Sequence, residues 1–442
     1  MALWRAELTA CWLSALPVVP DGGNSHQKAP PASVRLSSTL ATFSPNSPPG
    51  IPCAAYASSR PMSKPLYQCL VFGNPSDNQL IAFSASFGDA LHHFDLKSGT
   101  DYIIAVGITR DFVETVPTVA IFFGGAGTTL KEHAELVRLS IPIVPLVSSL
   151  KNVSAELPEC LRAINALALV DSDTGLLKPA AVALQCLGLL PSQRRVFLSY
   201  RRDESREVAL QLFETLSAKQ FDVFLDTHSV AAAVDFQTML WHRLCDADVV
   251  VMLDTPRYFD SRWTKVEWGR AIDKHISILQ VIWPGHSVSR FARLAMPLPL
   301  QAGDLEGSRL TDATIERVAL AVEALRSKSI ALRHANIAGG LRSAVEELGG
   351  SVAGHGPRRS IVLTLPSGAP LVAYPSVGVP TAVTLHEAVY DGDARPVAVV
   401  YDHVGLSDHW MTHLEWLGTS FTSVRWLRSR EVGWDLANLA EL

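Results

Sequence analysis

A tryptophan and a glutamate near the middle of the chain have the spacing of neighbours on one helix face. Ser261 is a natural N-cap for a helix over residues 263–274, which places Trp263 and Glu267 four residues apart. An aromatic plane beside a carboxylate suits a substrate with a flat base and a ribose, because the ring stacks on the base while the carboxylate binds hydroxyls and faces developing positive charge. Taken alone, such residues are ordinarily a packing tryptophan and a solvated glutamate.

The segments around this pair predict a parallel sheet. Short apolar runs alternate with stretches that have apolar residues at helical spacing. This alternation, with short loops, predicts a sheet covered by helices on both faces in a flavodoxin-like winding. The expected strands are 195–198, 222–225, 249–253 and 278–282, and the expected helices are 205–218, 236–245 and 263–274.

The carboxyl ends of these strands should form the ligand crevice of the sheet. Tyr200 and Arg201 follow the first strand, Asp226 the second and Asp254 the third, and the segment up to Glu267 lies on the same side. We therefore expect a polar, aromatic and carboxylate-bearing crevice. Tyr200 also fits a packing role at a strand end, and Arg201 also fits a solvated position.

A glycine-rich loop stands out in an earlier ordered region, residues 65–190. Strands are expected at 67–72, 102–108, 119–123 and 141–147, and helices at 82–94 and 130–139. Gly124, Gly125, Gly127 and Thr128 join a strand to a helix, which indicates a Rossmann-like βαβ unit. Small residues here let backbone N–H groups approach a phosphate, so the loop could hold a small nucleotide. The full GxGxxG pattern is absent, and a plain tight turn is the alternative.

The chain after residue 285 predicts two further regions. Residues 286–349 read as a helical connector, broken near Gly339 and Gly340. Residues 350–442 read as a small α/β accessory domain with a hairpin around Gly368. His409 and His413 share a helical face there, but the glutamate of a zinc-protease HExxH pattern is missing, so we expect no metal site.

Composition sets the limits on partners and surroundings. The 442 residues are 48% hydrophobic and 18% charged, which is enough apolar content for several cores. A net charge of -5 gives no electrostatic argument for binding nucleic acid or an anionic membrane. The six cysteines contain no CxxC pair, which favours a reducing compartment.

The N-terminal segment, residues 1–64, is expected to be flexible. It is rich in Pro, Ser, Ala and Gly, and Arg5 and Glu7 interrupt its one apolar run. Met62, just before the first expected strand, is an alternative start of translation. No run is apolar and long enough to span a bilayer, so we expect a cytoplasmic protein with no membrane contact.

Three segments of residues 194–285 together resemble a TIR domain of the bacterial, NAD-cleaving type. Residues 196–200 (VFLSY) resemble the family's first conserved box, and residues 222–226 with the loop to Asp235 resemble the strand and BB loop. Residues 258–267 resemble its S-x-W-x-x-x-E segment. The three segments occur in the family's order and spacing. The glycine-loop region, in turn, is faintly similar to the SLOG nucleotide-sensing domains.

The TIR resemblance implies NAD+ glycohydrolase activity, with no cofactor other than NAD+ as the substrate. Glu267 matches the catalytic glutamate, Trp263 and Tyr200 would line the base and nicotinamide site, and Arg201, Asp226 and Ser261 are further substrate contacts. Products would be nicotinamide with ADP-ribose or a cyclic analogue, in a signalling or antiviral defence effector that is active as a homo-oligomer. A non-catalytic TIR assembly module is the alternative. One departure from the family is the BB loop, which has three alanines at 231–233 in place of a proline or glycine turn.

Overall fold

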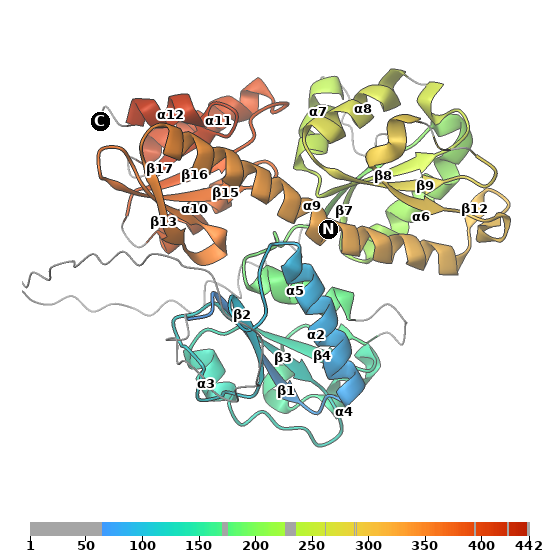
Figure 1. Cartoon of the computed structure of the whole chain (residues 1–442). Coiled ribbons are helices and arrows are strands. Elements are labelled where there is room, and N and C mark those ends of the chain that lie inside the picture. The colour runs from blue at the N-terminus through green and yellow to red at the C-terminus, as the bar shows by residue number, and fades with distance from the viewer. Residues whose placement is uncertain are drawn as a thin grey trace, which may run out of the picture. The chain divides into compact units, whose positions relative to one another are not determined.

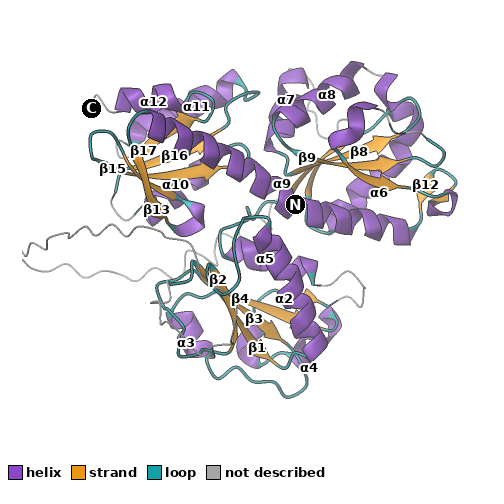
Figure 2. Ribbon diagram, in the orientation of Figure 1, coloured by secondary structure: helices purple, strands orange, loops and turns teal. Residues whose placement is uncertain are grey.

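Three five-stranded sheets make up the described part of the chain. The computed structural model describes residues 64–169, 176–225, 236–260, 262–286, 288, 290–392, 395–421 and 424–439 (Figures 1 and 2). These residues all belong to one compact unit that begins at Arg60. The predicted flexible segment 1–64 lies outside them apart from its last residue. Within these ranges, no helix is both long enough and apolar enough to cross a membrane.

The first sheet is parallel throughout and has the strand order β2-β1-β3-β4-β5. Its central strands are mostly apolar and almost entirely buried, as expected for strands covered on both faces. The strands are β1 (Tyr67–Gly73), β2 (Tyr102–Val106), β3 (Thr118–Phe123), β4 (Ile143–Val147) and β5 (Leu167–Ala168). The helices are α2 (Asp77–His92), α3 (His133–Arg138), α4 (Val153–Glu156) and α5 (Leu177–Cys186).

Both helices predicted in the first region have different bounds. Helix α2 begins five residues before the predicted 82, because Ser76 and Gln79 form a capping box at its start. Helix α3 has six residues where ten were predicted, and it starts at His133. The later start has a local cause. The Thr128 hydroxyl donates to the Glu156 carbonyl and Leu130 is buried, so these contacts hold the segment before His133 outside the helix. The glycine loop therefore does not lead directly into a helix.

The second sheet has the order β10-β9-β8-β6-β7, again parallel throughout. This is the flavodoxin-like winding that the sequence predicted, read from the other edge. Its strands are β6 (Arg195–Ser199), β7 (Asp222–Leu225), β8 (Val249–Asp254), β9 (Ser277–Ile282) and β10 (Met296–Pro299). Its helices are α6 (Arg202–Ala218), α7 (Phe236–Asp246) and α8 (Arg262–Asp273).

The second sheet continues beyond the predicted domain end at residue 285. Strand β10 adds to β9 inside the segment predicted as a helical connector, and a small hairpin of β11 (Leu305–Glu306) and β12 (Arg309–Leu310) follows. The β10 sequence, MPLP, has prolines at alternate positions and lies at a sheet edge, where a missing N–H donor is tolerated. Its short length gave no strand pattern to detect.

The third sheet is mixed. Strands β13 (Ser351–His355), β14 (Ile361–Thr364) and β15 (Pro370–Ser376) are antiparallel, while β16 (Val397–Tyr401) and β17 (Val424–Arg428) continue in parallel. Helices α10 (Ala382–Asp391), α11 (Asp408–Ser420) and α12 (Val432–Leu439) complete it. The predicted multi-domain α/β fold class is therefore confirmed.

Helix α9 (Asp312–Glu347) is one helix of 36 residues. The predicted break at Gly339 and Gly340 is wrong. Both glycines are exposed, while Ala338 and Leu341 beside them are buried against the third sheet. Packing of these neighbours outweighs the roughly 1 kcal/mol that a glycine costs inside a helix.

Successive stretches of α9 belong to three different cores. Its first half, including Val318 and Val322, packs in the core of the second sheet. Ile330 and Ala331 then join the core of the first sheet. Leu341, near its end, belongs to the core of the third sheet. One helix thus contributes apolar side chains to every sheet.

Buried arginines fasten α9 to the second sheet. The Arg326 guanidinium is fully buried, and its Nε donates to Asp248 Oδ2 at 2.7 Å. Its Nη2 donates to the carbonyls of Pro191 and Gln193 at 2.6 and 3.0 Å. Arg333, about two helical turns further on, donates to the carbonyls of Ala247 and Cys245. These contacts satisfy charges that would otherwise be costly to bury.

A buried histidine on α9 should make the protein sensitive to acid. Burial, and then the charge of Arg359, lowers the pKa of His334 from 6.5 to about 3. The ring is therefore neutral in the folded protein, whereas the unfolded chain binds a proton below about pH 6.5. Stability should be lost as pH falls from about 6.5 towards 3.

We expect His334→Leu to reduce this loss. The urea midpoint of the variant should fall less than that of the wild type between pH 7.5 and pH 5. His409→Leu, at an exposed position, is the control and should leave the pH dependence unchanged. An equal fall in the wild type and His334→Leu would show that His334 is not responsible.

Candidate functional site

The second sheet has a topological switch point between β6 and β8. Strand β6 lies between β7 and β8, so the loops that leave β6 and β8 run to opposite sides. In open parallel sheets, ligands bind in the crevice that such diverging loops leave at the carboxyl edge. Ser199 ends β6, and Tyr258 follows β8 in a short 3-10 turn (Tyr258–Asp260), so both belong to this edge.

The carboxylate of Glu267 is held at this switch point. Glu267 lies on α8 and is partly exposed. The Ser199 hydroxyl donates to its Oε2 at 2.5 Å. A hydroxyl-to-carboxylate hydrogen bond of this length is a charge-assisted one. The helix face that the sequence predicted for Glu267 thus turns towards the end of β6.

Tyr258 extends the hydrogen-bonded group below Glu267. Its hydroxyl oxygen lies 2.6 Å from Ser199 Oγ, and its ring is almost fully buried. Burial, and then the negative charge of Glu267, raises the pKa of Tyr258 well above 10. The tyrosine therefore stays protonated. Its own carbonyl accepts a hydrogen bond from Thr264 Oγ1 at 2.7 Å, which ties the turn to the first part of α8.

A second carboxylate, Asp254, ends β8 at the same edge and is fully buried. Gln280 Nε2 donates to its Oδ2 at 2.6 Å, and His286 Nε2 lies 3.4 Å from its Oδ1. Burial raises the pKa of Asp254, while the hydrogen bond from Gln280 and the charge of His286 oppose the rise. Asp254 is therefore held from the β9 side and is inaccessible to a ligand in this arrangement.

Two further predicted contacts have structural partners. Tyr200 is 7% exposed and packs in the apolar core of the sheet, which favours the packing role that was one of its two interpretations. Arg201 Nη1 donates to the carbonyl of Arg257 at 3.0 Å, and its guanidinium lies 3.9 Å from Glu204. Arg201 thus connects the loops that follow β6 and β8.

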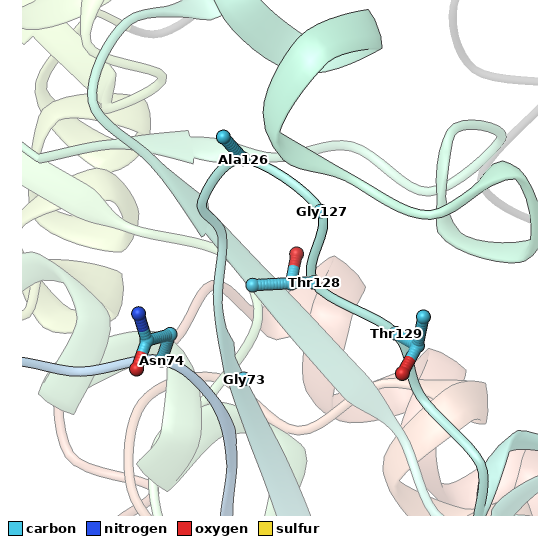
Figure 3. A pocket seen from close by; sticks show the side chains of 6 residues that line it. All are labelled: Gly73, Asn74, Ala126, Gly127, Thr128 and Thr129. Atoms are coloured by element: carbon cyan, nitrogen blue, oxygen red, sulfur yellow. The ribbon is translucent and has the colours of Figure 1, made fainter.

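A pocket also lies at the carboxyl edge of the first sheet. Its strand order places a switch point between β1 and β3, and an open cavity of about 310 Å³ lies between the loops that leave these strands. Figure 3 shows the lining residues, which are Gly73, Asn74, Ala126, Gly127, Thr128 and Thr129. Two of the four predicted loop residues, Gly127 and Thr128, therefore face this cavity. A second cavity of about 250 Å³ shares Gly73 and Thr129 with it and reaches Lys131.

Gly73, which lines the pocket, and Gly124, at the start of the glycine loop, each lie very close to the backbone of a neighbouring strand. A Cβ on Gly73 would lie 1.9 Å from the Phe123 carbonyl oxygen, and one on Gly124 would lie 2.8 Å from that of Leu146. Only glycine permits this approach of backbone to backbone. The Glu156 carbonyl fixes the loop by accepting from the N–H of Gly125 at 3.0 Å. In the part of the chain described, the N–H groups of Ala126 and Gly127 donate to no other backbone group.

Residues 196–318 match the family model of the TIR domain. The match begins at β6 and ends inside α9, so it contains Ser199, Tyr258 and Glu267. The chain carries a TIR domain. This agrees with the resemblance found in the sequence, whereas residues 65–190, with their faint similarity to SLOG domains, lie outside the match.

The other comparisons add little to the TIR assignment. No curated protein matches the chain. A solved structure, the tagatose-6-phosphate ketose/aldose isomerase of Escherichia coli, is similar at 16% identity over 61% of this chain and 82% of that one, with a TM-score of 0.15. A score this low carries no argument about the fold or the function.

Several predicted residues of the TIR domain lie outside the described part. Asp226 and Ser261 are among them, as is the alanine-rich BB loop at 229–235. The backbone of Trp263 belongs to α8, but its side chain is not described. For the predicted pair, the structure therefore describes only that Trp263 and Glu267 belong to the same helix, α8.

Ser199 and Tyr258 are the residues that sequence reasoning missed in the TIR domain. Both lie in segments that resemble the TIR family, but the sequence pattern predicted no role for either residue. A usable signal existed for Ser199, since it is a polar residue at the end of an apolar strand on the ligand side of the sheet. Tyr258 gave no such signal, because its contact with Ser199 depends on the fold.

Proposed function

We propose that the TIR domain cleaves the bond between nicotinamide and ribose in NAD+, with Glu267 as the catalytic residue. One observation carries this proposal. The carboxylate of Glu267 is partly exposed and is fixed by Ser199 at the switch point of the sheet, where ligands of such folds bind. A fixed anion at that place suits a reaction that develops positive charge on a sugar.

The chemistry requires little more than this anion and correct orientation. As the C1′–N bond breaks, its electron pair goes to the nicotinamide nitrogen, which leaves as a neutral molecule, so no acid is needed. The ribose becomes oxocarbenium-like, and a carboxylate beside it lowers the energy of that state. Water then attacks C1′ and loses a proton, which gives ADP-ribose, or the adenine of the same molecule attacks and gives a cyclic product.

Assembly of TIR domains into a homo-oligomer is part of this proposal, as is a role in signalling or defence. The alternative is a TIR module that assembles without catalysis. Tyr200 in the core and Arg201 between two loops favour that alternative to a degree, because both have structural partners. The two functions differ in one measurable way, which is the release of nicotinamide.

Product chromatography of the full-length, assembled protein with NAD+ tests the proposal. Light scattering first establishes that the protein is oligomeric, since a monomer is not the proposed active form. We expect nicotinamide together with either ADP-ribose or a cyclic product whose mass is lower than that of ADP-ribose by one water. An oligomer that releases no nicotinamide would instead identify the assembly module.

We also propose that the pocket of the first sheet binds a small phosphate-bearing molecule such as a nucleotide. Its support is the position at a switch point, the nearby Lys131, and the N–H groups of Ala126 and Gly127, which donate to no backbone carbonyl within the described ranges. A phosphate would meet N–H donors of the loop itself, because α3 is short and starts further on.

Thermal unfolding in the presence of AMP or inorganic phosphate tests this pocket. AMP should raise the Tm of the wild type, and Ala126→Asp should abolish the rise because a carboxylate repels the phosphate. Ala126→Ser, which is neutral and nearly as small, should retain it. A rise with inorganic phosphate alone would indicate a simple anion site, and an equal rise in Ala126→Asp would place AMP elsewhere.

A further inference from the structure

The direction of the hydrogen bonds around Ser199 can be worked out from its single proton. A serine hydroxyl has one hydrogen to donate and two lone pairs that accept. Ser199 donates to Glu267 Oε2, so its oxygen is left as an acceptor. The contact of 2.6 Å with Tyr258 therefore has the tyrosine hydroxyl as donor. The order of donation is Tyr258 to Ser199 to Glu267.

This order depends on the charge of Glu267. Both hydrogen bonds are donated in the direction of the carboxylate. This direction suits an ionised group, which can only accept. A protonated carboxyl that donated to Ser199 would take up the second lone pair of its oxygen, and the serine proton would then lose Glu267 as its acceptor. Ser199 and Tyr258 are 2% and 1% exposed, so water does not readily substitute for either hydroxyl.

The turn that carries Tyr258 is itself fastened to the helix of Glu267. Thr264, three residues before Glu267 on α8, donates to the Tyr258 carbonyl. The tyrosine also packs edge-on against Phe259, whose ring in turn contacts Trp268 of α8. Movement of the tyrosine relative to Glu267 is therefore restricted both through the backbone and through packed rings.

We infer that Ser199 and Tyr258 are positioning residues for Glu267, which hold one carboxylate oxygen in place for the reaction. The inference rests on the proposed function, because positioning matters to catalysis only if Glu267 is the catalytic residue. Neither hydroxyl needs to touch NAD+. The hydrogen-bonded route from Tyr258 to Glu267 passes through the Ser199 hydroxyl.

Steady-state kinetics of the assembled protein with NAD+ test this order of action. Ser199→Ala should lower kcat by about 10- to 100-fold, as expected for a lost hydrogen bond to a charged group, with KM nearly unchanged. Tyr258→Phe should lower kcat by roughly 3- to 10-fold, as for a neutral hydrogen bond. In the Ser199→Ala background, Tyr258→Phe should have no further effect on kcat, because the hydroxyl it acts through is gone.

The matched control is Thr314→Val. Thr314 is buried on α9 and its hydroxyl donates to Asp304 at 2.8 Å, so the variant loses a similar hydrogen bond that involves none of Ser199, Tyr258 and Glu267. It should lower Tm but leave kcat unchanged. Equal losses of kcat in Thr314→Val and Ser199→Ala, or additive losses for Ser199→Ala and Tyr258→Phe, would overturn the inference.

A measurement without NAD+ separates this inference from the proposed function. Ser199→Ala should lower Tm by more in the wild type than in the Glu267→Ala background, because the hydrogen bond exists only in the former. If the Tm losses of Ser199→Ala and Glu267→Ala simply add in the double variant, the hydrogen bond between Ser199 and Glu267 does not exist and the inference is overturned. A coupled Tm together with an inactive oligomer would reject the proposed function and, with it, the catalytic part of the inference.

Discussion

Glu267→Gln should lower nicotinamide release from NAD+ by about 100- to 1,000-fold, which is the usual effect of removing one electrostatic contact to a developing charge. Glutamine keeps the size of the side chain and an oxygen that accepts from Ser199, so the change removes mainly the negative charge. The loss should appear in kcat, because the charge acts on the cleavage step. Chromatographic assay of nicotinamide with both proteins oligomeric is the measurement.

Glu214→Gln is the matched control for this prediction. Glu214 lies exposed on α6 of the same domain, so the same substitution there should leave nicotinamide release unchanged. The Tm of Glu267→Gln should stay close to that of the wild type, which would exclude misfolding as the cause. Undiminished release by Glu267→Gln would mean that another group faces the ribose.

Arg326→Met should destabilise the protein by about 3–5 kcal/mol, as is typical when one partner of a buried ion pair is removed. The side chain of Arg326 is fully buried and that of Asp248 nearly so, and methionine would leave the Asp248 carboxylate without its cationic partner. The carbonyls of Pro191 and Gln193 would lose a donor as well. Urea denaturation followed by tryptophan fluorescence measures the loss.

An exposed arginine of the same helix provides the comparison. Arg317 pairs with Asp304 at 2.7 Å, but its side chain is 46% exposed. Arg317→Met should cost no more than about 1 kcal/mol, as for other surface ion pairs. Asp248→Leu combined with Arg326→Met should recover part of the stability, because no unpaired charge then remains buried. Equal losses in the two single variants would contradict the role assigned to burial.

The parallel sheets were the most predictable part of the fold. Their strands are short, continuous apolar runs, and that pattern requires cover on both faces whatever the rest of the chain does. Strand β10 and the continuity of α9 were not predictable by the same means. The first is a proline-containing edge strand recruited by β9, and the second crosses two glycines because flanking residues are buried in a distant core.

Only those residues of the candidate site that follow from local sequence patterns could be predicted. Four-residue spacing and the strand-end rule placed Glu267 at the ligand edge without any knowledge of contacts. The contacts of Ser199 with Tyr258 and Glu267 join segments that are far apart in the sequence, and no local pattern encodes them. Arg201 combines both cases. Its position after β6 was predictable from the sequence, but its contact with the Arg257 carbonyl was not.

The long helix α9 limits how this protein can be divided or recombined. Up to Leu325 its buried face completes the TIR domain core, and from Ile330 it completes the other two. A fragment that ends at residue 318, where the TIR family match ends, would lack Val322 and Leu325. The apolar surface of the TIR core that these two side chains cover would then be exposed to water. An exchange of this TIR domain for another should therefore be joined within residues 326–329, with Arg326 retained on the TIR side. Arg333 should also be kept, because it donates from beyond this junction to the carbonyls of Ala247 and Cys245 in the TIR domain.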